Sequence, residues 1–285
     1  MKVYETGNIR NVVVMGHGGC GKTTLVEAIA YQTGITARMG KVTDGNTISD
    51  YDKEEQKRQF SISTSVVPVE FEDIKINFLD TPGYFDFVGE VEEACHAAGA
   101  AVIVINGKSG VEVGTLKAWE LCEKYKLPRL FFVTGMDDDQ ASYRKIVLEL
   151  NDRFGRKVAP FHVPIRENEK FVGFVNVVKM KGRRFINDTS EYEECDIPDY
   201  MDKHLNISRD ALVEAVADTS EELMERYFAG EEFTYEEVST ALRTHVMDCQ
   251  IVPVLVGSGV HNQGTSMLMN VIKKYFPSPE YTVNN

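Results

Sequence analysis

The sequence has 285 residues, of which 43% are hydrophobic and 26% charged, enough for one large globular domain or a domain that carries an insertion. Its net charge of −13 argues against a chain that wraps nucleic acid by bulk electrostatics, so we expect no direct nucleic-acid binding by this acidic segment. It has no apolar run long enough to span a membrane and no apolar signal-peptide core, so we expect a soluble cytoplasmic protein with no membrane partner. Its five cysteines are scattered and lack C-x-x-C spacing, so we expect reduced thiols.

The first predicted element is a short buried strand, Val12–Met15, which leads through a glycine-rich turn into a helix from Thr23 to about Thr33 that Gly34 ends. The turn and the start of the helix fit the pattern G-x-x-x-x-G-K-[ST] of a phosphate-binding loop. Glycines let backbone N–H groups converge on phosphate oxygens, and the helix N-terminus adds partial positive charge. An ordinary glycine turn is the alternative, but it does not explain why lysine and threonine follow the last glycine.

This pattern assigns a set of nucleotide contacts. Lys22 would reach the terminal phosphates, the Thr23 hydroxyl would bind magnesium, and Cys20 is interpreted as a small residue that fills the turn rather than as a catalytic thiol. The predicted contacts are His17, Gly18, Gly19, Cys20, Gly21, Lys22, Thr23 and Thr24.

A long polar stretch without clear periodicity lies between Gly34 and Ser61. Loops of this length are usually functional or disordered, and this one follows the phosphate-binding loop, where nucleotide switches keep a mobile segment. The Ser61 hydroxyl is a candidate to complete a magnesium shell when a triphosphate is bound. Ser63 and Thr64 leave the register open, and the alternative is that these residues form the polar face of a strand.

Two strand-like runs, Ile62–Phe71 and Ile74–Leu79, are predicted to form a hairpin, and Pro68 places the first run at a sheet edge or at a bulge. The second run ends in Asp80-Thr-Pro-Gly83. An acid at a strand end beside a phosphate-binding loop can hold a magnesium-bound water, and a glycine N–H there can contact a γ-phosphate. The same four residues are also a common turn, but in this position we favour the functional interpretation.

Strands and helices then alternate, which predicts a mostly parallel sheet. The predicted helices are Phe85–Ala98, Val111–Tyr125 and Gln140–Phe154, and the predicted strands are Ala101–Ile105 and Leu130–Val133. The second of these strands is followed by Thr134-Gly-Met-Asp137, so that another acid stands at a strand end. Asp137 can accept hydrogen bonds from two donors on a guanine edge, which adenine does not present; a solvated loop acid is the alternative, since Asp138 and Asp139 lie beside it.

The alternation breaks between residues 161 and 250, where two strand-like runs precede two acidic amphipathic helices, at about Asp210–Phe228 and Tyr235–Asp248. Thr234 and Glu237 form a capping box for the second helix. The strand Ile251–Val256 then resumes the core sheet, and a helix follows over Thr265–Tyr275. The backbone after this strand, at Ser258 and Gly259, is a candidate to approach a base, although this signal is weak by itself.

The predicted fold is therefore an α/β P-loop NTPase fold, with a mostly parallel sheet flanked by helices and an α+β insertion. We assign residues 1–160 and 251–280 to the core, 161–250 to the insertion and 281–285 to the start of a linker.

Taken together, these motifs resemble the G domain of translational GTPases, most closely elongation factor G, and the chain is similar to a divergent paralogue of that factor. The resemblance implies binding of GTP or GDP with Mg²⁺, a ribosomal partner for the full-length protein in protein biosynthesis, and further domains after Pro279. It rests on Gly16–Thr24, Glu55–Ile62, Asp80–Gly83, Ser220–Thr234, Ile251–Ser258 and Tyr275–Pro279.

Several residues depart from the family pattern. Tyr84 stands where the family has the histidine that positions the attacking water, and a phenol with a pKa near 10 is not an equivalent group. Thr134 and Gly135 replace the asparagine and lysine of the guanine motif, while Gly19 and Gln59 replace an aspartate and a glycine. Ser61 replaces a threonine but keeps the hydroxyl.

Three interpretations of function remain open at this point. The first is a GTP-binding factor that hydrolyses GTP slowly or not at all, with Gly83 and Tyr84 as its catalytic positions. The second is a normal translational GTPase in which Tyr84, or a residue elsewhere, orients the water. The third is a ribosome-binding scaffold with structural nucleotide or none. A change of base preference to ATP is a further possibility because the guanine motif is incomplete.

Overall fold

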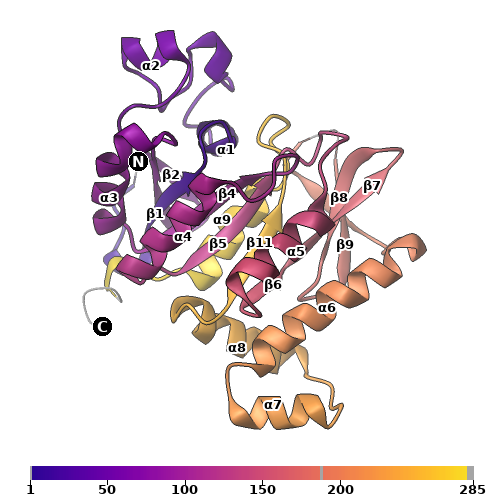
Figure 1. The fold of residues 1–285 in the computed structure, drawn as a ribbon. Helices are drawn as coiled ribbons and strands as arrows, with labels where there is room; N and C mark the ends of the chain where they lie inside the picture. Colours follow the sequence, from indigo (N-terminus) through magenta and orange to yellow (C-terminus); the bar gives the residue numbers. More distant parts are fainter. Residues whose placement is uncertain (1, 187–188, 281–285) are drawn as a thin grey trace.

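The computed structural model describes residues 2–186 and 189–280, so the predicted linker at 281–285 lies outside the described residues. Within these residues the chain forms a seven-stranded sheet and a separate four-stranded sheet (Figure 1). No helix of the described part is long and apolar enough to cross a membrane.

The larger sheet confirms the predicted α/β class. Its strand order is β2-β3-β1-β4-β5-β11-β6, and every neighbouring pair is parallel except the β2–β3 hairpin. As predicted, Pro68 lies in β2 at the edge of the sheet. An edge strand has a neighbouring strand on one side only, so the N–H that proline lacks does not interrupt a second hydrogen-bond ladder. The strands are β1 Ile9–Gly16, β2 Ser65–Phe71, β3 Ile74–Asp80, β4 Ala100–Asn106, β5 Arg129–Thr134, β6 Val158–Pro160 and β11 Val252–Val256.

Helices cover both faces of this sheet, because its central strands are apolar on both sides. Figure 1 shows α4 and α5 in front of the sheet and α9 behind it. Helix α3 packs against α4, and α1 packs against α9. Their bounds are α1 Lys22–Gln32, α3 Val88–Ala97, α4 Val113–Tyr125, α5 Tyr143–Phe154 and α9 Thr265–Tyr275.

The predicted strand Ile62–Phe71 was three residues too long, because β2 begins at Ser65. The N–H groups of Ile62 and Ser63 donate to the carboxylate of Glu55, at 2.9 and 3.1 Å, and the N–H of Thr64 donates to Glu90 Oε2 at 2.7 Å. These donors are therefore turned away from β3 and cannot extend the ladder.

Two predicted helices also begin later than expected. A 3-10 turn over Phe85–Phe87 precedes α3, so the helix predicted from Phe85 is α-helical only from Val88. The helix predicted from Gln140 begins at Tyr143, because Ser142 donates its N–H to Gly107 O at 3.0 Å instead of entering a helical turn.

Short elements interrupt the polar stretch from 34 to 61, which was predicted as a loop. Helix α2, Lys53–Arg58, is only six residues long and begins with a capping box between Asp52 and Glu55. A helix this short shows no apolar period, which is why the sequence pattern did not reveal it. Figure 1 shows α2 at one edge of the molecule, beyond α1.

The insertion contains more elements than predicted. Its sheet is antiparallel, in the order β10-β9-β8-β7, where two strand-like runs had been expected. The single helix predicted over Asp210–Phe228 was wrong: α6 ends at Ala217, and Ser220 caps a separate α7 by accepting the N–H of Leu223 at 3.2 Å. The elements are β7 His162–Glu167, β8 Lys170–Asn176, β9 Lys181–Phe185, β10 Tyr192–Cys195, α6 Asp202–Ala217, α7 Glu221–Phe228 and α8 Tyr235–Met247.

The chain returns from the insertion to the core at β11, as predicted. The capping box of Thr234 and Glu237 at the start of α8 is also confirmed. β6 pairs with β11 at the edge of the core sheet, and β7 begins two residues later in the other sheet. The proposed domain boundaries at residues 160 and 251 stay a prediction.

Candidate functional site

The glycine-rich loop joins the end of β1 to the start of α1 and needs its glycines. Gly16, Gly19 and Gly21 have φ of +147°, +78° and +101°, which side chains rarely tolerate. A Cβ on Gly16 would also lie 2.4 Å from Val104 O of the neighbouring β4. Lys22 is buried, and its ammonium donates to Gly16 O at 3.1 Å and His17 O at 2.9 Å, which fixes it across the loop.

A cavity of about 250 Å³ opens beside this loop. Three segments that are far apart in the sequence meet around it: the glycine-rich loop, the polar stretch between 34 and 61, and the turn after β3. Its lining residues are Gly18, Gly19, Gly21, Lys22, Thr23, Thr24, Val42, Asp50, Gln59, Phe60, Ser61, Thr81, Gly83 and Tyr84.

Oxygen groups gather where the sequence placed magnesium. The hydroxyls of Thr23 and Ser61 lie 3.1 Å apart, and Ser61 donates to Asp50 Oδ1 at 2.7 Å. Asp80 is buried beneath them, and neither of its carboxylate oxygens has a hydrogen-bond partner in the described structure. Burial raises the pKa of Asp80 to about 6, although Ser49, Lys22 and Thr23 oppose the rise.

These groups fit a magnesium ion that is shared with a nucleotide. Mg²⁺ prefers oxygen ligands and keeps several waters, so it is commonly held by one or two protein groups together with phosphates. The two unpartnered oxygens of Asp80 are the acceptors that a metal-bound water would satisfy. The part of the chain described here has no group of three or more His, Cys, Asp or Glu side chains able to hold a metal alone.

Gly83 and Tyr84 approach the glycine-rich loop from the turn after β3. A Cβ on Gly83 would lie 2.5 Å from Lys22 Nζ and 2.7 Å from Gly18 Cα, so only glycine fits at this position so close to the glycine-rich loop. Tyr84 is 48% exposed, and its ring centroid lies 4.7 Å from that of Phe60. Tyr84 therefore stands at the rim of the cavity and touches the polar stretch.

The side chains of His17 and Cys20 do not enter this cavity. His17 Nδ1 accepts the N–H of Gly114 at 3.2 Å, and its Nε2 lies 3.6 Å from Glu112 Oε1, so His17 ties the loop to the start of α4. Burial raises the pKa of the Cys20 thiol, which keeps it protonated and unreactive.

The two predicted base-contacting segments lie against each other and against the start of α1. Thr134 Oγ1 accepts the N–H of Gly259 at 3.3 Å, and its methyl group would lie 3.2 Å from a Cβ on Gly21. Ser258 is buried, and its hydroxyl accepts the N–H of His261 at 3.3 Å, so this side chain supports its own loop. Asp137 is exposed, with its carboxylate 3.7 Å from His261 Nε2.

The comparisons with known proteins agree with this geometry. The sequence model of the elongation factor Tu GTP binding domain matches residues 7–278, which is nearly the whole chain. The chain belongs to this family. It is therefore a G domain of the translational GTPases, and membership implies binding of a guanine nucleotide.

A crystal structure of a protein from Thermus thermophilus is similar to this G domain, with a TM-score of 0.88 and 36% sequence identity. The match covers 97% of this chain but only 41% of the Thermus protein. The chain thus spans less than half the length of that relative.

Three residues near the site were not singled out from the sequence. Asp50 lines the nucleotide cavity and is buried, and burial raises its pKa. Glu27, on α1, is buried and accepts the N–H groups of Gly40 and Ile48, each at 2.7 Å. Glu27 could have been recognised from the sequence, because it is a carboxylate inside the apolar run of α1. Asp50 could not, because it lies in a segment without hydrophobic periodicity.

The third residue is Arg166, on β7 of the insertion. Its guanidinium donates to Ala141 O at 2.9 Å, Met136 O at 3.2 Å and Asp138 O at 2.5 Å. These carbonyls belong to the loop that carries Asp137, so the insertion helps to hold a loop of the G domain in place.

Proposed function

We propose that this G domain is the nucleotide-binding part of an elongation factor G-like translation factor, a divergent paralogue that acts on the ribosome in the cytoplasm. It binds GTP or GDP with Mg²⁺ and hydrolyses GTP slowly or not at all. Family membership, the oxygen groups beside Lys22 and the similarity of the insertion sequence to that factor support this proposal.

Different residues would contact the phosphates, the metal and the base of the nucleotide. The loop N–H groups and Lys22 hold the phosphates, while Thr23, Ser61 and, through water, Asp80 face the metal. Magnesium, when bound, neutralises charge on the phosphate oxygens. Thr134, Asp137, Ser258 and Gly259 form the base side, where the Asp137 carboxylate favours guanine over adenine.

Tyr84 is the observation that carries the proposal of slow turnover. Lys22, Asp50 and Tyr84 are the titratable side chains that line the cavity in the described part of the chain. A phenol can hydrogen-bond to a water molecule, but it is a poor general base at neutral pH. The contact with Phe60 also holds the ring against the polar stretch, so Tyr84 can orient a water without activating it.

The test is GTP turnover by the full-length protein with ribosomes, compared among the wild type, Tyr84→Phe and Tyr84→His. We expect slow turnover in the wild type and a clear gain in Tyr84→His, because imidazole is the better water-positioning group. Rapid wild-type turnover that Tyr84→Phe leaves undiminished would contradict the proposal.

Base preference is tested by competition of GTP, GDP and ATP for the purified protein. We expect both guanine nucleotides to displace ATP and Lys22→Ala to weaken all three without unfolding the domain. If ATP wins, the guanine assignment of Asp137 fails; if a folded sample binds no nucleotide, a ribosome-binding scaffold is the correct function.

A further inference from the structure

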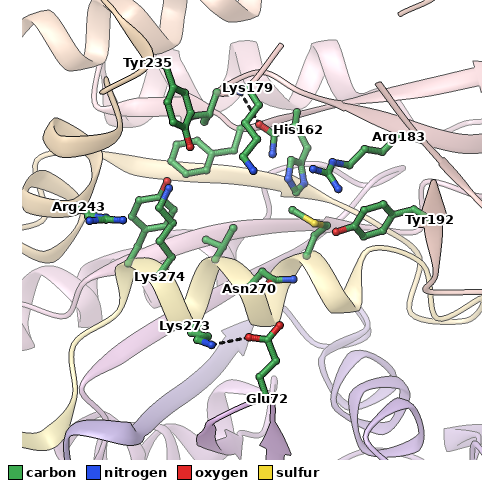
Figure 2. Close-up of a pocket in the computed structure, with 16 residues that line it drawn as sticks. Glu72, His162, Lys179, Arg183, Tyr192, Tyr235, Arg243, Asn270, Lys273 and Lys274 are labelled. Carbon is green, nitrogen blue, oxygen red and sulfur yellow. Dashed lines mark hydrogen bonds and ion pairs between the residues drawn. The ribbon is translucent and has the colours of Figure 1, made fainter. Parts of the chain in front are cut away.

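A second cavity, of about 490 Å³, lies between the G-domain core and the insertion (Figure 2). One wall is formed by α9 and Glu72 of the β2–β3 turn, and the other by the four-stranded sheet and α8. It shares no lining residue with the cavity beside the glycine-rich loop. Its volume is within the range of small-molecule sites.

The cavity is rich in cations, although the chain as a whole carries a net charge of −13. Lys179, Arg243 and Lys274 line it, and none of the three has an ion-pair partner among residues 2–186 and 189–280. Burial lowers the pKa of Lys274; Tyr235 opposes this fall, while the charges of Arg243 and Lys179 add to it. The carboxylate that lines the cavity, Glu72, pairs with Lys273, and Lys274 donates to the hydroxyl of Ser239 at 3.2 Å.

Two buried side chains at the insertion wall have nitrogen atoms without a partner. His162 is 1% exposed and Arg183 is 8% exposed, and neither His162 Nε2 nor Arg183 Nε has a hydrogen-bond partner in the described structure. Burial lowers the pKa of His162 to about 3, so its ring is neutral at physiological pH. Figure 2 shows both side chains beside Lys179, pointing into the cavity.

Lys273 of this region is already neutralised, because it pairs with Glu72 at 2.6 Å and with Asp73. Arg183 is compensated only in part: its Nη2 lies 3.6 Å from Glu194 Oε1, while its Nε has no partner in the described structure. Positive charge is thus spread along the cavity, from Arg243 at one end to Arg183 at the other (Figure 2). Native proteins rarely leave buried polar nitrogens unpaired, so this arrangement calls for an anionic ligand.

We propose that this cavity binds a small phosphorylated molecule, whose phosphate oxygens contact Lys179, Arg183 and Lys274. Guanidinium and ammonium groups together suit phosphate, because arginine offers a planar pair of donors and lysine a point charge. Tyr192 and Tyr235 at opposite ends of the cavity give apolar surface for the remainder of the molecule. A small anion is favoured over an acidic protein segment because it must reach the buried nitrogens of His162 and Arg183.

The probe for this site is inorganic pyrophosphate, titrated calorimetrically into the full-length protein after saturation with GDP. We expect binding to the wild type, and about tenfold weaker binding when Lys179→Gln and Lys274→Gln are combined, because charge-assisted hydrogen bonds are lost. Lys179 is exposed and Lys274 is partly exposed, so the double variant is expected to fold. Lys181→Gln, an exposed position on β9 outside the cavity, is the matched control and should bind as the wild type does.

Two further measurements locate the binding. Pyrophosphate should protect Lys179 and Lys274, but not Lys181, from acetylation detected by mass spectrometry. Binding should also persist in Lys22→Ala, since the glycine-rich loop is not the proposed site. No binding to the GDP-saturated wild type, equal affinity in the double variant, loss of binding in Lys22→Ala, or tighter binding of a poly-glutamate peptide than of pyrophosphate would each overturn the proposal.

Discussion

At the scale of single residues, Asp80 combines two properties that oppose each other. In the proposed magnesium site its carboxylate would accept from a metal-bound water, yet in this structure both oxygens are buried and unpartnered. Burial destabilises the charged carboxylate more than Ser49, Lys22 and Thr23 stabilise it, which is why its pKa rises from 3.8 to about 6. The nucleotide-free domain therefore carries a local cost that ligand binding removes.

Asp80→Asn is expected to stabilise the nucleotide-free domain by roughly 2 kcal/mol at pH 7, since the amide carries no charge to desolvate. Because the folded-state pKa is raised, the wild-type cost is absent below about pH 4, where the carboxyl is protonated in both states, grows between about pH 4 and pH 6, and stays constant above that range. Chemical denaturation at several pH values measures this difference. A variant less stable than the wild type at pH 7 would show that Asp80 has favourable partners.

Thr134 also connects three loops, a structural role that was not predicted from the sequence. Its hydroxyl joins the loop after β5 to Gly259 after β11, and its methyl group packs near Gly21 of the glycine-rich loop. This short side chain thus connects the loops after β5 and β11 to the glycine-rich loop.

Thr134→Val should weaken GDP binding by about fivefold, because it keeps the shape but leaves the Gly259 N–H unpaired, a loss of ~1 kcal/mol. Thr134→Ser, which keeps the hydroxyl, should bind GDP nearly as well as the wild type. Fluorescence titration with a labelled GDP compares the three proteins. Equal affinity in Thr134→Val and the wild type would rule out this role.

At the scale of elements, two buried carboxylates shape the polar stretch from 34 to 61. Glu27 holds the backbone at Gly40 and Ile48, while Glu55 holds it at Ile62 and Ser63. The segment thereby brings Asp50 and Ser61 to the nucleotide cavity. The expectation that this stretch is disordered without a triphosphate stays a prediction, but these contacts define the conformation it can adopt.

Glu27→Gln should loosen the stretch, since an amide can accept only through one oxygen and presents a donor to the second N–H group. We expect hydrogen exchange at Gly40 and Ile48 to become about tenfold faster, because hydrogen bonds to charged groups contribute ~1.5–3 kcal/mol. Glu54→Gln, exposed on α2, serves as the control and should exchange as the wild type does. Unchanged exchange in Glu27→Gln would mean that other contacts hold this stretch.

Sequence reasoning worked best where the signal is contiguous. The strand, glycine turn and helix around Lys22 are adjacent in the chain, so their pattern predicted the fold class and the strand–turn–helix unit that the structure confirms. Glu27, Asp50 and Arg166 act on segments that only the tertiary fold brings near, and a single sequence cannot show such contacts. The missed break between α6 and α7 is different: Ser220 followed by two glutamates is a helix start, and the acidic run concealed it.

At the scale of the whole molecule, the insertion is more than an appendage, because Arg166 of β7 binds the carbonyls of the loop that carries Asp137. The antiparallel sheet is therefore mechanically connected to the loop after β5. Movement of the insertion would shift Asp137 relative to the glycine-rich loop.

Arg166→Ala should weaken GDP binding by roughly three- to tenfold through a looser Asp137 loop, the effect of losing charge-assisted hydrogen bonds to backbone. Arg184→Ala, which removes the partner of Glu167 in the same sheet, is the control and should leave affinity unchanged. Nucleotide affinity is measured together with the melting temperature. A fall in both variants alike would point to general damage to the insertion instead.

The position of β11 has a consequence for how the protein is made. This strand lies between β5 and β6 in the sheet, yet it is synthesised after the whole insertion. In the nascent chain, the strands β1, β2, β3, β4 and β5 can pair with one another early. The free edge of β5 can pair only after β11 has been synthesised, and β6 joins the sheet only through β11. Long-range pairings of this kind form late in folding. The half of the sheet that carries the glycine-rich loop can thus assemble during synthesis before the half that contains β11 and β6.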